Sequence, residues 1–136
     1  MPSATWALQQ AVYAALAADQ AITQALGASG RIFDHVPPGA GFPRVAFAQV
    51  TSRDWSTGEQ PGEEHTVILH VWSREKGKRQ AQEIAASLRA CLHDQPLVLQ
   101  GHRLVNLRHE STDVRREPDG LSIRAVLRLR AVTEPL

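Results

Sequence analysis

The sequence predicts an α+β two-layer domain, in which helices pack on one face of a mainly antiparallel sheet of about four to five strands. Two patterns support this prediction. Segments with strand-like alternation follow one another through turns rather than through helices, and hairpin links of this kind favour antiparallel pairing. Two segments with helical spacing supply the second layer. The chain of 136 residues is expected to form one domain, residues 1–136.

The composition excludes several classes of protein. The 15 basic and 14 acidic residues give a net charge of +1, so no overall field would attract nucleic acid or an anionic membrane. Cys91 is the only cysteine, so no internal disulfide can form. We find neither the basic and apolar stretches of a signal peptide nor an apolar run long enough for a membrane span. The expectation is a soluble domain made in the cytoplasm.

The N-terminal region predicts two consecutive helices. Ser3 or Thr5 can cap the first helix, and its apolar side chains recur at helical spacing. Asp19 is expected to cap a second, short helix through "QAITQALG", which Gly27 ends.

The next segments read as strands around a polar insertion. A short extended piece covers Arg31–Phe33, and a strand runs from about Arg44 to Thr51. The turn-rich stretch Arg53–Gly62 lacks hydrophobic periodicity, so we expect a mobile loop or a long hairpin arm, flexible over about residues 53–63. The strand Glu64–Trp72 is partly apolar on both faces, which is typical of a central strand.

The second main helix is expected from about Lys76 to His93. Its apolar residues form one stripe: Ala81, Ile84, Ala85, Leu88, Cys91 and Leu92. At the corner that precedes it, Trp72 is expected to pack under the first turn of this helix. Ser73 is expected to cap the helix N-terminus.

The C-terminal third predicts strands joined by tight turns. A hairpin turns at Gln100-Gly101 and continues as a strand to about Arg115, and "EPDG" has the residues of a type I turn. In the last strand, Leu121–Val132, the inward and outward side chains alternate. The inward residues are Ile123, Ala125, Leu127 and Leu129, and the outward ones are Arg124, Val126, Arg128 and Arg130.

The sequence offers no catalytic, cofactor-binding or metal-binding motif. The Gly-rich stretches lack the context of a phosphate loop, and the six histidines show no close metal-ligand spacing. His65 and His70 should project to opposite faces of their strand. Cys91 lies on an apolar stripe, where a thiol behaves as a small hydrophobe. We therefore expect no enzyme activity, no cofactor and no metal.

The outward arginines of the last strand have two interpretations. Arg124, Arg128 and Arg130 share one face with basic residues of the preceding strand. They can pair across strands with Glu110, Asp113 and Glu117, which gives a mixed solvated face. Alternatively, they form a charged face that docks on a partner or lines a channel. No aromatic residues interleave with the arginines, so a single-strand nucleic-acid platform is not expected.

The order of several short motifs resembles a known family. The segments "ALAADQAITQALG", "RIFDHVPPGAGFPRVAF", "EEHTVILHVWSREKGKRQAQEIAASL" and "PDGLSIRAVLRLRAVTE" follow one another here. Together, over about Leu8–Glu134, they resemble the tail-completion, or tail-terminator, proteins of long-tailed phages, prophages and gene transfer agents. The most similar pieces are Arg31–Asp34, Phe42-Pro43, Val71–Arg74 and Asp119-Gly120.

The resemblance implies a virion structural protein rather than an enzyme. Such proteins form a ring, typically a homo-hexamer, that caps the head-proximal end of the tail tube and joins it to the neck. The implied partners are further copies of the chain, the tail-tube protein and the neck or connector (stopper) protein. DNA would at most pass through the lumen, and no membrane is involved. The implied place is the tail-neck junction of the virion, after assembly in the bacterial cytoplasm.

Three other functions stay open at this stage. They are another neck component, such as a head-completion or stopper protein, a small hydrolase or nuclease, and a regulatory interaction domain whose oligomer never meets a tail. The candidate partner contacts are chosen for exposure and chemistry. They are Asp54, Trp55, Glu59 and Glu63 in the loop, and Arg124, Arg128 and Arg130 on the last strand.

Overall fold

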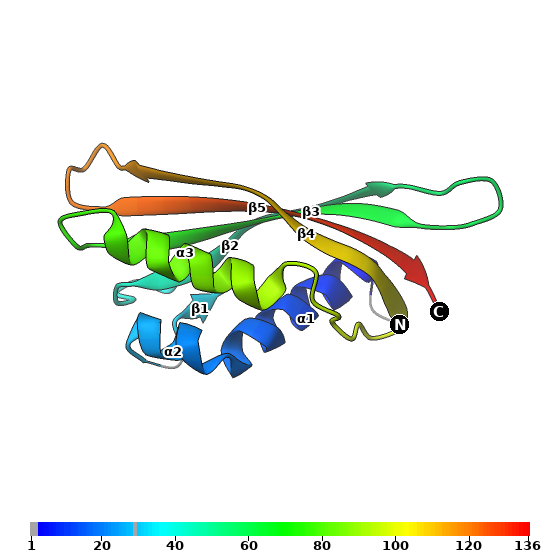
Figure 1. The fold of residues 1–136 in the computed structure, drawn as a ribbon, viewed down its shortest axis with the longest axis horizontal. Helices are drawn as coiled ribbons and strands as arrows, with labels where there is room; N and C mark the ends of the chain where they lie inside the picture. Colours follow the sequence, from blue (N-terminus) through cyan, green and yellow to red (C-terminus); the bar gives the residue numbers. More distant parts are fainter. Residues whose placement is uncertain (1–2, 29) are drawn as a thin grey trace.

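The computed structural model describes residues 3–28 and 30–136 as two layers, a sheet and a set of helices that cover part of one of its faces (Figure 1). Within these residues the elements are α1 (Ala4–Ala18), α2 (Gln20–Leu26), β1 (Ile32–Phe33), β2 (Arg44–Asp54), β3 (Glu63–Ser73), α3 (Arg79–Leu92), β4 (His102–Arg116) and β5 (Ile123–Pro135). The predicted α+β class is confirmed.

The sheet has the strand order β1-β2-β3-β5-β4. The two-residue strand β1 pairs parallel with β2, and the other neighbours are antiparallel. As predicted, β3 is central, between β2 and β5. The hairpins β2–β3 and β4–β5 therefore lie side by side and share the β3–β5 ladder, which places their turns at opposite ends of the sheet (Figure 1).

The predicted caps of the N-terminal helices are confirmed. The Ser3 hydroxyl accepts a hydrogen bond from the Trp6 N–H at 3.1 Å, and the Asp19 carboxylate accepts one from the Ile22 N–H at 3.0 Å. Gly27 ends α2 with a φ of 80°, a left-handed conformation that glycine adopts without steric cost.

The β2–β3 hairpin is longer than the sequence predicts. β2 continues past Thr51 to Asp54, and the ladder includes the pairs Ser52–His65 and Arg53–Glu64. The prediction ended too early because these residues are polar on both faces. This end of the ladder protrudes from the helical layer, so it needs no apolar face. Cross-strand polar and ionic pairs stabilise it instead.

Two predictions at the corner after β3 are wrong. α3 begins at Arg79, and its N-cap residue Lys78 makes no side-chain capping bond. Ser73 does not cap the helix: its buried hydroxyl donates to Gln80 Oε1 at 2.7 Å and accepts from the Glu75 N–H at 3.2 Å. Trp72 does not pack under α3, because the strand alternation turns it to the opposite face of the sheet, where it pairs with Arg44 and Arg124.

The C-terminal hairpin follows the prediction closely. Leu99 and His102 form an isolated bridge around the turn at Gln100-Gly101. The "EPDG" turn is closed by the Gly120 N–H, which donates to the Glu117 carbonyl at 3.1 Å. All four predicted inward residues of β5 are buried.

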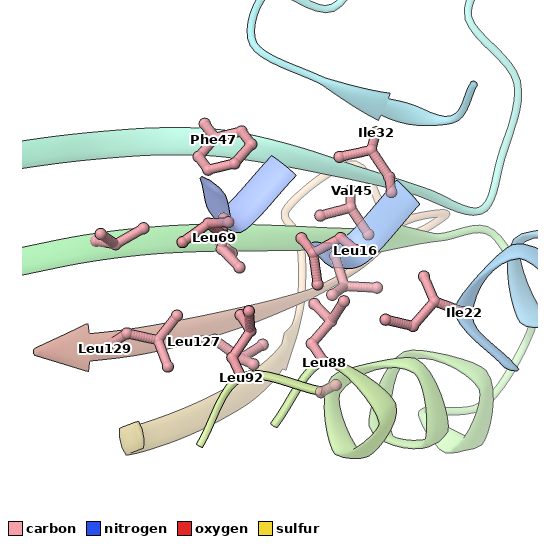
Figure 2. Close-up of a cluster of buried hydrophobic side chains, with 14 of the residues drawn as sticks. Leu16, Ile22, Ile32, Val45, Phe47, Leu69, Leu88, Leu92, Leu127 and Leu129 are labelled. Atoms are coloured by element: carbon pink, nitrogen blue, oxygen red, sulfur yellow. The ribbon is translucent and has the colours of Figure 1, made fainter. Parts of the chain in front are cut away.

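The core lies between the inner face of the sheet and the three helices (Figure 2). Leu16 of α1, Ile22 of α2 and Leu88 of α3 meet there above Leu69 and Leu127 of the central strands, and all five side chains are fully buried. Burial of such side chains contributes about 1.5–3 kcal/mol each.

Candidate interaction surfaces

The tip of the β2–β3 hairpin forms an arm, defined here as residues 54–63, that extends beyond the helices (Figure 1). Thr57 and Gln60 bridge across its turn. The Asp54 carboxylate accepts hydrogen bonds from the Ser56 hydroxyl at 2.6 Å and the Ser56 N–H at 3.2 Å, and these bonds lower the pKa of Asp54. Of the two expected arrangements, the segment is therefore a hairpin arm with internal hydrogen bonds.

The predicted contact residues of the arm lie at three different places. Asp54 and Glu63 pair with each other in the ladder and line a hollow of about 270 Å³ that His102 and Thr133 also border. Glu59 is exposed at the turn. Trp55 is 44% exposed, and the guanidinium of Arg130 lies 5.1 Å from its ring centroid. The fold thus brings together Trp55 and Arg130, which are 75 residues apart in the chain.

Glu64 connects Arg130 with Arg53, a second arginine beside the Trp55 ring. The sequence analysis did not predict this role of Glu64. Its carboxylate accepts hydrogen bonds from Arg53 and Arg130, and Arg53 also approaches the Trp55 ring at 5.8 Å. The hydrogen bond from Arg53 is the main cause that lowers the pKa of Glu64, and Arg130 adds to it. In the ladder, Glu64 lies directly opposite Arg53 and diagonally from Arg130, so its role depends on the register of three strands.

The outward arginines of β5 are paired. Arg124 Nε lies 2.5 Å from Glu117 Oε1, and Arg128 Nε lies 3.2 Å from Glu110 Oε1. Cross-strand pairing with Glu110 and Glu117 was one of the two interpretations, and it is confirmed. The third predicted acid, Asp113, pairs with Arg115 on its own strand. A docking role of these arginines stays a prediction.

A second aromatic and arginine cluster lies at the other end of the same face. The Arg44 guanidinium stacks at 4.2 Å from the Phe42 ring and 6.0 Å from the Trp72 ring, and Arg74 stacks on Phe42 at 4.5 Å. Burial, together with the nearby Arg74 charge, lowers the pKa of Arg44. Arg124 also lies over Trp72, at 5.4 Å. Contacts of this kind contribute about 0.5–2 kcal/mol each, so the cluster stabilises this corner.

The outer face of α1 carries aromatic side chains that sequence reasoning missed as a surface. Trp6 is 46% and Tyr13 is 43% exposed. Together with Phe47 of β2 they border a hollow of about 380 Å³. The sequence signal was the complete lack of charged residues in Ala4–Ala18.

Among the residues that the structure describes, no group of three or more His, Cys, Asp or Glu side chains could hold a metal ion. Burial raises the pKa of the Cys91 thiol to about 11, which makes it a poor nucleophile at neutral pH. His65 and His70 lie on opposite faces, as predicted: His65 is buried on the helix side between Ser52 and Thr133.

These features define an α+β domain that exposes aromatic and arginine side chains on its surface. The family model described as tail completion protein gp17 matches residues 10–134. The chain therefore belongs to the tail completion protein family and is a phage virion structural protein, as the order of motifs predicted.

A solved structure agrees with this assignment. A chain from the virion of a native gene transfer agent particle has 30% sequence identity and a TM-score of 0.88. The match covers 98% of this chain and 99% of that chain. No curated protein matches the sequence. None of the described helices is long and apolar enough to cross a membrane.

Proposed function

We propose that this protein forms a ring, a homo-hexamer, that caps the head-proximal end of the tail tube and joins it to the neck. The observation that carries the proposal is the match along nearly the full length to a chain of a gene transfer agent virion, together with membership in the tail completion family. The unit that assembles is the single domain 1–136. It acts by contact rather than by catalysis, at the tail-neck junction, after assembly in the bacterial cytoplasm.

Two surfaces are assigned to the partners. The arm, with Asp54, Trp55, Glu59 and Glu63, contacts the tail-tube protein or the neighbouring subunit. An arm that protrudes from the core can be held by a partner without disturbing the fold. Arg124, Arg128 and Arg130 supply charged contacts, in which carboxylates of the tube or neck (stopper) protein compete with Glu117, Glu110 and Glu64. DNA passes through the lumen at most.

Deletion of the gene in cells that make the particle tests the function. Negative-stain electron microscopy then measures tail length and the fraction of heads joined to tails. We expect overlong tails beside separate, filled heads, because nothing caps the tube. Tails of normal length on empty or leaking heads would assign the protein to another neck component, such as a stopper. Normal joined particles would contradict any structural role.

Substitutions in the arm test the assigned contact. Trp55→Ala removes the exposed ring but leaves the ladder Asp54–Glu63 intact. We expect a folded protein with a thermal midpoint within a few degrees of the wild type and at least tenfold fewer joined particles. The matched control is Leu121→Ala, an exposed apolar residue on the turn at the opposite end of the sheet. Equal joining by both variants would exclude a contact role of Trp55.

A further inference from the structure

The outer face of α1 has the composition of a covered surface. None of the 15 residues in Ala4–Ala18 is charged, yet Trp6 and Tyr13 stand nearly half exposed. A helix that is apolar on most sides is normally buried, and exposed aromatic residues are enriched in protein interfaces. The sheet, α2 and α3 pack against this helix and leave its face with Trp6 and Tyr13 uncovered.

The edge of the sheet next to α1 is open as well. β1 pairs only with Val45 and Ala46, so β2 lacks a strand neighbour on this side from Phe47 onward. The hollow of about 380 Å³ lies at this place, between the aromatic rings of α1 and Phe47. We call Trp6, Gln10, Tyr13 and Phe47 the α1 surface.

The opposite edge of the sheet offers a different surface. β4 is the outermost strand there, with Val105 48% exposed, and Val98 in the preceding loop is 93% exposed. A hollow of about 430 Å³ lies between that loop and β4. Its lining is mixed, with the apolar Pro96, Leu104, Val105 and Leu107 beside the polar Asp94, Gln95, Asn106 and Arg108. We call Pro96, Val98, Leu104 and Val105 the β4 surface. Each edge thus has exposed apolar groups beside a hollow that can receive such groups.

The charged side chains nearest the two surfaces are engaged within their own subunit. On the α1 side, the Asp34 carboxylate accepts a hydrogen bond from Gln9, and the Arg31 guanidinium donates to backbone carbonyls. Beside the β4 surface, Arg103 pairs with Glu134 and Arg108 pairs with Asp94. Two apolar surfaces of this kind can be buried against each other without leaving an unpaired charge in the contact.

We propose that the α1 surface of one copy of this chain docks against the β4 surface of the next copy. The two surfaces are different and lie at opposite edges of one sheet, so each copy can contact one neighbour on either side. Repeated head-to-tail contacts form a ring when the rotation from one copy to the next closes. The inference rests on the ring of the proposed function and names the side chains that join its subunits. Trp6 and Tyr13 enter the hollow beside β4, while Val98 and Val105 cover the rings.

Cysteine cross-linking tests the pairing, with Cys91→Ala as the background. Gln10→Cys marks the α1 surface and Val105→Cys marks the β4 surface, and a short flexible bis-maleimide joins thiols across a contact. The variants are examined as free protein and in particles assembled in cells that lack the wild-type gene. We expect the double variant to give a ladder of covalent multimers in the particles and each single variant to stay monomeric. A dimer of the Gln10→Cys variant alone, or no ladder from particles that contain the double variant, would overturn the pairing.

A charge test separates this inference from the proposed function. Gln10→Lys places an unpaired positive charge on the α1 surface, and Val105→Glu places an unpaired negative charge on the β4 surface. We expect each single variant to lose at least tenfold in subunit affinity or particle incorporation and the double variant to recover most of this loss. No recovery in the double variant would contradict the β4 partner even where deletion gives overlong tails. A cross-linked ring in a protein whose deletion leaves the tails normal would retain the pairing and reject the tail-capping function.

Discussion

The helices α1 and α3 lie on the same face of the sheet but differ on their outward sides. Both bury leucines in one core, such as Leu16 of α1 and Leu88 of α3. α3 exposes charged residues, among them Arg79 and Glu83, which form an ion pair at 2.9 Å. α1 exposes Trp6 and Tyr13 and has no charged residue. The inner faces of both helices form the core of one chain. The outer face of α3 meets water, whereas we infer that the outer face of α1 meets a neighbouring copy.

The largest expected loss of stability is the same for both helices. Leu16→Ala and Leu88→Ala each remove a fully buried side chain, so each is expected to lower the free energy of unfolding by about 2–5 kcal/mol. Urea unfolding, followed by circular dichroism, measures both variants. A cost below about 1 kcal/mol for Leu16→Ala alone would mean that α1 is not part of the core of the free chain.

The next prediction separates the helices. Gln10→Lys and Gln82→Lys make the same change at exposed positions of α1 and α3. Both are expected to change the free energy of unfolding by no more than about 0.5 kcal/mol, as surface substitutions usually do. Only Gln10→Lys is expected to reduce assembly, by tenfold or more in the yield of joined particles. Comparable losses from Gln82→Lys would show that the outer faces are equivalent.

A pH dependence follows from the network that connects α1 to the sheet. The Thr5 and Ser52 hydroxyls lie 2.5 Å apart, and Ser52 in turn lies 2.5 Å from Nδ1 of the buried His65. Burial, with a further contribution from His102, lowers the pKa of His65, against an opposite effect of Glu63. In the unfolded chain, His65 therefore binds a proton near pH 6.5, whereas in the folded protein it does so only at lower pH. Stability should fall as the pH drops below this value.

Replacement of the imidazole checks this assignment. His65→Gln retains hydrogen-bonding groups but cannot titrate, so its stability should fall less between pH 7 and pH 5 than that of the wild type. His70 and His109 also have lowered pKa values, so some dependence on pH remains. An unchanged slope in the variant would exclude His65 as its source.

The last prediction concerns the contact between α1 and α3 at Cys91 and requires no change in the stability of the fold. Its thiol donates to the Ala15 carbonyl of α1 at 3.5 Å, and its pKa is raised to about 11. At pH 8 only roughly one thiol in a thousand is then ionised, so alkylation should be about a hundredfold slower than in the urea-unfolded chain. Timed iodoacetamide labelling with mass spectrometry measures the ratio. Equal rates would mean that α1 and α3 separate readily in the free protein.

The fold was predictable where local chemistry decides it. Ser3, Asp19 and Gly27 cap helices through their own side-chain or backbone properties, and the alternation in β5 separates its two faces. Errors arose at the end of β2, where tertiary contacts decide, and at the corner after β3, where the strand alternation continues to its last residues. The polar end of β2 is held as a strand by cross-strand pairs. Trp72 is placed by the strand alternation and by arginines distant in sequence, rather than by its proximity to α3.

The candidate surfaces were predictable only in part. Pairing of Arg124 and Arg128 with nearby acids follows from strand register, which the sequence suggested. The meeting of Trp55 with Arg130 depends on the pairing of two hairpins, so no local pattern could indicate it. The α1 surface could have been found from the uncharged helix, but this feature has meaning only when the structure shows which side the core leaves open.

Thiol labelling of α1 and α3 in assembled particles tests the central claim most directly. Gln10→Cys and Gln82→Cys, each in the Cys91→Ala background, place single thiols on the outer faces of the two helices. In the free, monomeric chain both should react with a maleimide at similar rates. In intact particles we expect Cys at position 82 to react as before and Cys at position 10 to be protected at least tenfold. Equal labelling of both positions in the particles would contradict the claim that a neighbouring copy covers α1.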